Sequence, residues 1–118
     1  MYPEKIDFFE ERINDVTVIK AEGVINESNV YWLEIEFEEL LKRNDYKVVI
    51  NMDKLIFAGP VVWGLVLSQL WSLGEKGGGL KLAAMNNDMA GVFNDMQLSG
   101  IFEAYATQQE ALSSFRAQ

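Results

Sequence analysis

Residues 47–82 read KVVINMDKLIFAGPVVWGLVLSQLWSLGEKGGGLKL, and this stretch decides the fold. The run at 47–52 is apolar and β-branched without polar alternation, which is typical of a central strand covered on both faces. Pro60 suits the first position of a helix, because its fixed φ angle and missing N–H are tolerated there. The glycines at 77–79 end that helix, and residues 80–85 form the next strand. A strand–helix–strand unit of this kind predicts parallel strands in an α/β sheet.

A second helix is predicted before this unit. Asn26 or Ser28 can cap it, and the helical pattern extends to about Arg43. Its buried face consists of apolar residues at helical spacing: Val30, Leu33, Phe37, Leu40 and Leu41. The opposite face carries glutamates, so the helix is expected to lie on the surface with one side packed against the sheet.

The two ends of the chain supply further strands and a helix. Two β-prone runs, 8–13 and 16–23, flank an Asn-Asp pair that tolerates the positive φ angles of a hairpin turn. Residues 101–105 are predicted to form an edge strand. The segment Thr107–Phe115 is predicted to form a last amphipathic helix, with its cap at Thr107.

Residues 86–100 hold one more short helix, with Asn87 or Asp88 as its cap and with Val92 and Met96 pointing inward. The complete order is strand, strand and helix, followed by three strand–helix pairs. We therefore predict one α/β domain over residues 1–118. Its mixed sheet has four to five strands, opens with a β-hairpin and is covered mainly on one face by four helices.

The composition narrows the classes of partner. The chain has 10 basic and 18 acidic residues, a formal net charge of -8, which repels nucleic-acid phosphates and anionic lipid. The longest apolar stretch, 61–67, is interrupted by Gly64 and is too short to span a bilayer. With no signal-length apolar run at the N-terminus and no cysteine, we expect a cytoplasmic protein that neither binds nucleic acid nor inserts into a membrane.

The residue types also argue against catalysis. There is no histidine and no cysteine, so catalytic triads and thiolate or imidazole metal sites have no candidates. The carboxylates that circle the outer part of the first helix are typical of a solvated face: Glu34, Glu36, Glu38 and Glu39. The glycines at 77–79 follow a helix and precede a strand, whereas a phosphate-binding loop has the reverse order. We expect no catalytic residue, no metal site and no cofactor, and therefore no enzyme.

The helix that begins at Pro60 places some apolar residues on its polar side. At about 100° per residue, Trp63 falls at the middle of the apolar arc. Val61 and Leu65 fall among the polar residues. Two apolar side chains on the solvent-facing side of a helix are either isolated exposed residues or an anchor for a partner. We interpret them as an anchor.

The first helix has a similar feature. Tyr31, Trp32 and Ile35 lie away from its buried stripe, among glutamates. An exposed tryptophan is typical of a protein interface, which makes these residues candidates for partner contact. The alternative is that they pack against a neighbouring loop or against the N-terminus of the chain.

The chain resembles a STAS domain in three segments. These are VTVIKAEGVIN (16–26), the stretch from the apolar strand through the Gly-Gly turn (46–86), and VFNDMQLSGIFEAYATQQEALSSF (92–115). This is the fold of bacterial anti-sigma-factor antagonists, and the resemblance covers nearly the whole chain. It implies a STAS-like mixed sheet. It also implies docking of a regulatory partner at the strand-to-helix corner before Val61.

In family members that act as phosphorylation switches, this corner reads Asp-Ser-Ser-Gly-Leu-Gly, and a partner kinase that is also the anti-sigma factor phosphorylates the second serine. Aligned by the Gly-Gly turn, the present sequence has Gly59 for the aspartate and Pro60 and Val61 for the serines. Val62 stands for the glycine and Trp63 for the leucine, and only the final glycine is retained, as Gly64. The resemblance therefore implies no phosphorylation at the family position, Val61.

The resemblance implies a non-enzymatic regulator of transcription that binds a kinase-like anti-sigma factor or a related signalling protein and stays binding-competent. The residues expected at the contact are Gly59, Pro60, Val61, Val62, Leu65, Val24, Asn26, Tyr31, Trp32 and Ile35. A weak homodimer is compatible with this expectation. The alternative is a structural STAS subunit of a larger assembly, such as a stress-signalling scaffold or a lipid-transport complex.

Overall fold

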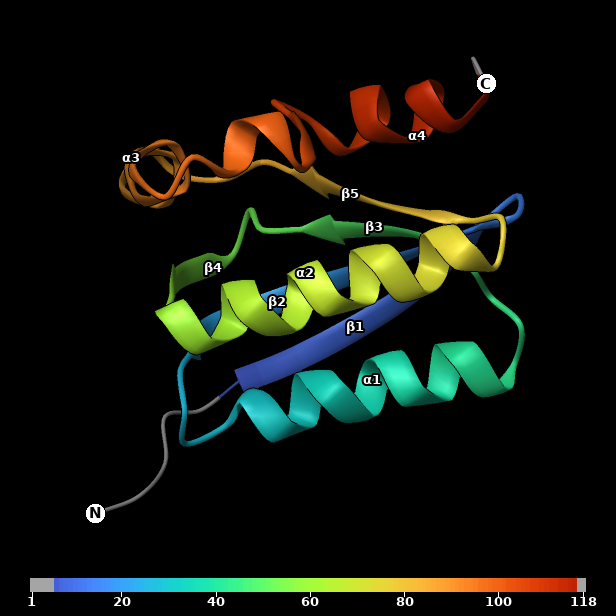
Figure 1. Cartoon of the computed structure of the whole chain (residues 1–118), viewed down its shortest axis with the longest axis horizontal. Helices are drawn as coiled ribbons and strands as arrows, with labels where there is room; N and C mark the ends of the chain where they lie inside the picture. Colours follow the sequence, from blue (N-terminus) through green and yellow to red (C-terminus); the bar gives the residue numbers. More distant parts are fainter. Residues whose placement is uncertain (1–5, 117–118) are drawn as a thin grey trace.

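A computed structural model describes residues 6–116 of the chain (Figure 1). In chain order the elements are β1 (Ile6–Ile13), β2 (Val16–Ile25), α1 (Val30–Lys42), β3 (Lys47–Asn51), β4 (Leu55–Ala58), α2 (Pro60–Glu75), β5 (Gly79–Ala83), α3 (Asn87–Asp95), the 3-10 turn η1 (Leu98–Gly100), β6 (Glu103–Tyr105) and α4 (Gln108–Arg116). The predicted α/β order, with its opening hairpin and four helices, is confirmed.

The six strands form one mixed sheet in the order β1-β2-β3-β5-β6, and β4 pairs with β2 outside this path. Among the described strands only the β1–β2 pair is antiparallel; β3, β4, β5 and β6 run parallel to their neighbours, as expected. The sheet has one strand more than the four to five predicted. The extra strand is β4, which follows the polar pair Asp53-Lys54 and is only 4 residues long.

A short turn separates β3 from β4. The Asn51 side chain accepts a hydrogen bond from the Asp53 N–H at 2.9 Å, and the Leu55 N–H donates to the Met52 carbonyl at 3.0 Å. After this turn β4 pairs with the end of β2, with a register shift between Gly23 and Val24. Because β3 uses the first half of β2 and β4 uses its last residues, one strand supports two parallel neighbours in succession.

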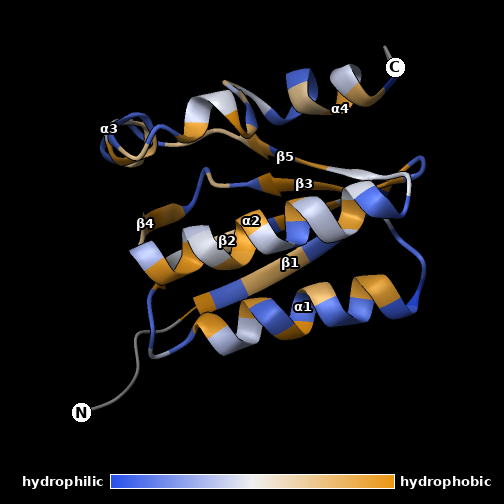
Figure 2. Cartoon of the chain, in the orientation of Figure 1, coloured by the Kyte–Doolittle hydropathy of each residue, from blue (hydrophilic) through white to orange (hydrophobic). Residues whose placement is uncertain are grey.

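Two apolar clusters lie on opposite faces of the sheet. Val48 and Ile50 of β3 join the main cluster, to which α1, α2 and α3 contribute, whereas Val49 between them joins a second cluster with α4. This alternation follows from the two-residue period of a strand. Three of the four helices thus contribute to one cluster, in line with the prediction, and α4 covers the other face. In Figure 2 the strands β3 and β4 are mainly apolar, while α1 is striped with hydrophilic residues.

The helix caps differ in detail from the sequence prediction. The cap of α1 is Asn29, not Asn26 or Ser28, and the cap of α3 is Asn86, whose side chain accepts a hydrogen bond from the Met89 N–H at 2.8 Å. Thr107 does cap α4. Its hydroxyl accepts from the Glu110 N–H at 3.1 Å and donates to the carboxylate of the same residue.

The buried face of α3 was also assigned incorrectly. Met89 and Phe93 are its buried residues, whereas Val92 is half-buried and Met96 is exposed. The cap is Asn86, one residue before the first predicted cap, and α3 therefore starts at Asn87. The assignment of the inward positions failed because this helix has only 9 residues and apolar groups on more than one side.

The inward face of α2 is turned relative to the prediction. Its buried residues are Val62, Trp63, Val66 and Leu73. Trp63 therefore lies at one flank of the buried arc, and the arc is rotated by roughly 60° from the predicted one. The rotation half-buries Leu65, whose predicted exposure is wrong, and it leaves Trp71 63% exposed.

We predict that Trp63→Ala destabilises the fold by about 3 to 5 kcal/mol, through lost burial and a residual cavity. Trp63 is 2% exposed, and its ring centroid lies 5.8 Å from that of Phe93 and 6.4 Å from that of Phe102. Urea unfolding measures the change. Trp71→Ala is the matched control, with an expected change within about 0.5 kcal/mol because the side chain is exposed. Equal stabilities of the two variants would contradict the packing of α2 described above.

A second prediction concerns the turn between α2 and β5. A Cβ atom on Gly78 would lie 1.8 Å from the carbonyl oxygen of Tyr46, so any side chain forces the backbone to shift. Gly78→Ala should destabilise the protein by about 1 to 3 kcal/mol. Gly74→Ala, in open space on α2, should instead stabilise it by up to about 1 kcal/mol. A neutral or stabilising Gly78→Ala in thermal unfolding would contradict the close contact between these two turns.

Candidate functional site

The corner between β4 and α2 is held by the last residues of β2. Gly59, the residue before α2, is extended, with φ −71° and ψ 168°. Its N–H donates to the Ile25 carbonyl at 2.9 Å, and its carbonyl accepts from the Val62 N–H at 3.0 Å. The backbone of the corner is thereby fixed from both sides. A side chain at this position would be tolerated, because the nearest atom to an added Cβ is the Ile25 carbonyl oxygen at 3.7 Å.

The loop from β2 to α1 borders this corner, because an added Cβ on Gly59 would also lie 3.8 Å from the Cα atom of Asn26. Asn26 organises the loop: its carbonyl accepts from the Val30 N–H at 2.9 Å, and its side-chain oxygen accepts from the Ser28 N–H at 2.9 Å. Buried Asn29 donates to the Val24 carbonyl at 2.8 Å. Val24 is part of strand β2, which ends at Ile25, and Asn26 begins the connection to α1.

The structure brings part of the predicted contact set together at this corner. Val61 is 44% exposed in the first turn of α2, beside exposed Pro60 and next to Gly59. Val62 is buried in the main cluster, so its side chain faces the core instead of solvent. Leu65 is half-buried and packs against the same cluster.

The remaining predicted residues lie on α1. Tyr31 and Trp32 are 60% and 55% exposed, and their ring centroids are 5.6 Å apart. Ile35 is half-buried. Helices α1 and α2 begin at the same end of the molecule, where β4 also lies (Figure 1). The elements that carry the two groups of predicted contact residues therefore begin at one end of the fold (Figure 1).

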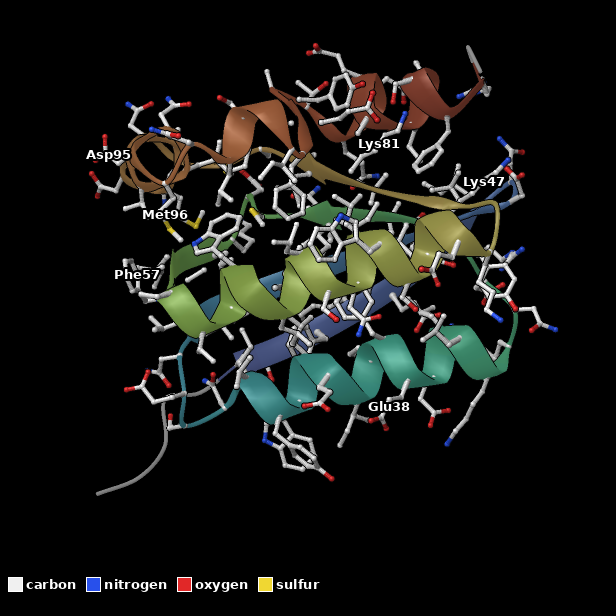
Figure 3. All side chains as sticks on the ribbon, viewed as in Figure 1. Glu38, Lys47, Phe57, Lys81, Asp95 and Met96 are labelled. Carbon is white, nitrogen blue, oxygen red and sulfur yellow. The ribbon has the colours of Figure 1, made fainter. Side chains whose placement is uncertain are left out.

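Two exposed residues at this end escaped the sequence prediction. Ile56 and Phe57 on β4 directly precede the corner and are both exposed. Phe57 projects from the end of the molecule where β4 meets α2 (Figure 3). The sequence carries no sign of this exposure, because residues 55–58 are all apolar and show no alternation. Trp71 was missed because of the rotated phase of α2.

None of the described residues with a shifted pKa lies at the corner. Among the described residues the shifted carboxyl groups include Asp15, where a hydrogen bond from Lys47 lowers the pKa, and Glu36, where burial raises the pKa. Asp15 belongs to the hairpin turn, and its partner Lys47 lies at the end of the molecule opposite Phe57 (Figure 3). Within residues 6–116 there is no cluster of metal-ligating side chains, and none of the helices could span a membrane.

Comparison with solved structures gives the same fold in regulatory proteins. An anti-sigma factor antagonist from Mycobacterium paratuberculosis has a TM-score of 0.87 and 21% identity, with 95% of each chain covered. The Bacillus cell fate determinant SpoIIAA in its phosphorylated form has a TM-score of 0.71 and 22% identity, covering 92% of this chain and 99% of its own. At such identities the likeness concerns the fold alone.

The same fold also occurs inside a larger protein. The murine Slc26a9 anion transporter matches with a TM-score of 0.68 and 13% identity, over 92% of this chain but only 19% of the transporter. No curated protein sequence gives a significant match. The STAS domain family, by contrast, matches residues 9–111, which include the hairpin, the corner and most of the sheet. On this match, and with a fold that agrees, the chain belongs to the STAS domain family.

Proposed function

We propose that the protein is a non-enzymatic regulatory module that binds a protein partner at the corner between β4 and α2. The observation that carries the proposal is the exposed Val61 on a corner whose backbone is fixed by β2. An apolar side chain on a rigid, partly apolar surface is suited to contact with another protein. Exposed Phe57 on the adjoining strand extends this surface.

In the proposed mode of action, the protein acts by staying bound to its partner, and no phosphorylation ends the binding. Gly59, Pro60, Val61 and Val62 have no hydroxyl group, so this corner offers no acceptor for phosphate. By analogy with anti-sigma factor antagonists, the partner is a kinase-like anti-sigma factor or a related signalling protein. The protein would sequester it in the cytoplasm for as long as both are present and would thereby regulate transcription.

A structural role in a larger assembly is the second candidate. The exposed side chain of Trp71 on α2 favours it, because this side chain is separated from the corner by nearly three helical turns and would suit a second contact. Light scattering on the purified chain separates the candidates. A structural subunit should self-associate, whereas an antagonist should be a monomer or a weak homodimer.

We predict that the corner remains unphosphorylated. The protein is incubated with its kinase-like partner and ATP, and phosphate is located by mass spectrometry. No phosphate is expected at residues 59–62. The nearest exposed hydroxyl on the same side of α2 belongs to Ser68, two turns after Val61. Stoichiometric phosphate on Ser68 would mean that the switch has moved along the helix, and the proposal of a permanent binding state would be wrong.

We also predict that Val61→Glu separates folding from binding. Stability should change by less than about 0.5 kcal/mol, because the side chain is exposed and a carboxylate suits the first turn of a helix. Binding should weaken about a hundredfold, since the carboxylate would be desolvated in an apolar contact. Calorimetric titration with the kinase-like partner measures the affinity, and melting curves measure the stability.

Ser68→Glu is the matched control, because it adds the same charge to the same exposed side of α2, two turns away. It should bind with nearly wild-type affinity. Leu65→Glu should destabilise the fold, because Leu65 packs against the main cluster. A Val61→Glu variant that folds and binds like the wild type would place the contact elsewhere.

A further inference from the structure

The outer side of α1 carries two aromatic side chains that are not required for packing of the helix against the sheet. Tyr31 and Trp32 are more than half exposed and touch each other edge to face, while the helix is anchored by Leu33, Phe37 and Leu40 on its other side. Burying two aromatic rings is strongly favourable. Their exposure as a neighbouring pair therefore points to contact with another molecule.

Helical geometry gathers these rings and two carboxylates on one face. Ile35 lies four residues after Tyr31 and three after Trp32, which is the spacing of side-chain neighbours on a helix. Glu34 and Glu38 lie three and seven residues after Tyr31, on the same side. Figure 3 shows Glu38 pointing away from the sheet and from α2. We call these five residues, 31, 32, 34, 35 and 38, the α1 face.

The charge of the α1 face is not balanced within the protein. Among the described residues, Glu34 and Glu38 form no ion pair, and both are exposed. Their neighbour Glu39 differs, because its carboxylate lies 3.6 Å from the ammonium group of Lys42. The aromatic pair is thus accompanied by two carboxylates that are free to pair with cations of another molecule.

We infer that the α1 face binds a basic segment, rich in arginine or lysine, of a protein partner. A guanidinium or ammonium group can stack on the ring of Trp32 or Tyr31, and the same segment can pair with Glu34 and Glu38. The aliphatic part of a long basic side chain can lie against half-buried Ile35. The inference rests on the proposed function, in that it gives the protein partner a second contact and a defined chemistry.

Charge complementarity distinguishes this occupant from a second copy of the chain. Two α1 faces packed against each other would bring Glu34 and Glu38 near their own counterparts, and like charges in contact are unfavourable. The whole chain carries a net charge of -8, so its other surfaces are on average poor partners for a face with two free carboxylates. A basic segment satisfies both the rings and the carboxylates.

The test uses the three tryptophans of the chain, Trp32, Trp63 and Trp71, labelled as 5-fluorotryptophan and observed by fluorine NMR. The probe is a helical peptide of alanine and leucine with an arginine at every fourth position. Its control has glutamate in place of arginine. The arginine peptide should shift the Trp32 signal and leave the signal of Trp71, equally exposed on α2, in place. The glutamate peptide should shift neither.

Two variants with equal net charge make the test specific. Glu34→Lys with Glu38→Lys should weaken peptide binding by roughly tenfold or more. Glu75→Lys with Asp95→Lys, on α2 and α3, should leave it within about twofold. An unmoved Trp32 signal, equal shifts of Trp32 and Trp71, or equal losses in the two double variants would each overturn the inference.

The variant Val61→Glu, which changes the corner alone, distinguishes a failure of this inference from a failure of the proposed function. Val61→Glu should bind the arginine peptide as the wild type does, because the α1 face is unchanged. If the peptide fails to bind while Val61→Glu still loses the kinase-like partner, the docking at the corner stands and the inference about the α1 face falls. If Val61→Glu weakens binding of the peptide as strongly as the lysine pair on α1 does, the peptide binds at the corner and the inference is likewise overturned.

Discussion

The pairing of β2 with two successive parallel strands is the constraint on which the rest of the structure depends. Its first half pairs with β3, and its last three residues pair with β4, with a register shift between Gly23 and Val24. Because β4 lies beside the end of β2, the Gly59 N–H reaches the Ile25 carbonyl, and α2 must start there. The corner is therefore positioned by the backbone of the sheet, while the side chains of residues 60 and 61 are exposed and stay outside the core.

Most of the architecture could be predicted from local patterns. The β-branched run before the turn, Pro60 at the helix start and the glycines after α2 each have a physical role that the structure confirms. Strand β4 could not be predicted from its own four residues, because a short, fully apolar segment carries no periodicity that distinguishes a strand from part of a buried helix. Its existence depends on a pairing with β2 that is distant in sequence.

The site was less predictable than the fold, because exposure depends on how neighbouring elements pack. For α2, periodicity alone gave a phase that was turned by about 60°. The rotation follows from packing of Trp63 on Phe93 and Phe102, residues 30 or more positions away. It buries part of Leu65 and exposes Trp71, and neither outcome is encoded within the helix itself. Tyr31 and Trp32 were placed correctly, since the buried stripe of α1 is regular.

In the account proposed here, the corner holds a protein partner without a phosphorylation step. Hydrogen–deuterium exchange of the free protein and of its complex with the kinase-like partner tests this claim most directly. The account predicts slower exchange in the complex for the amides of residues 26–30, 56–59, 61 and 62, with little change at the hairpin turn around Asn14 and Asp15. Protection confined to the hairpin end, with residues 56–62 exchanging as in the free protein, would contradict it.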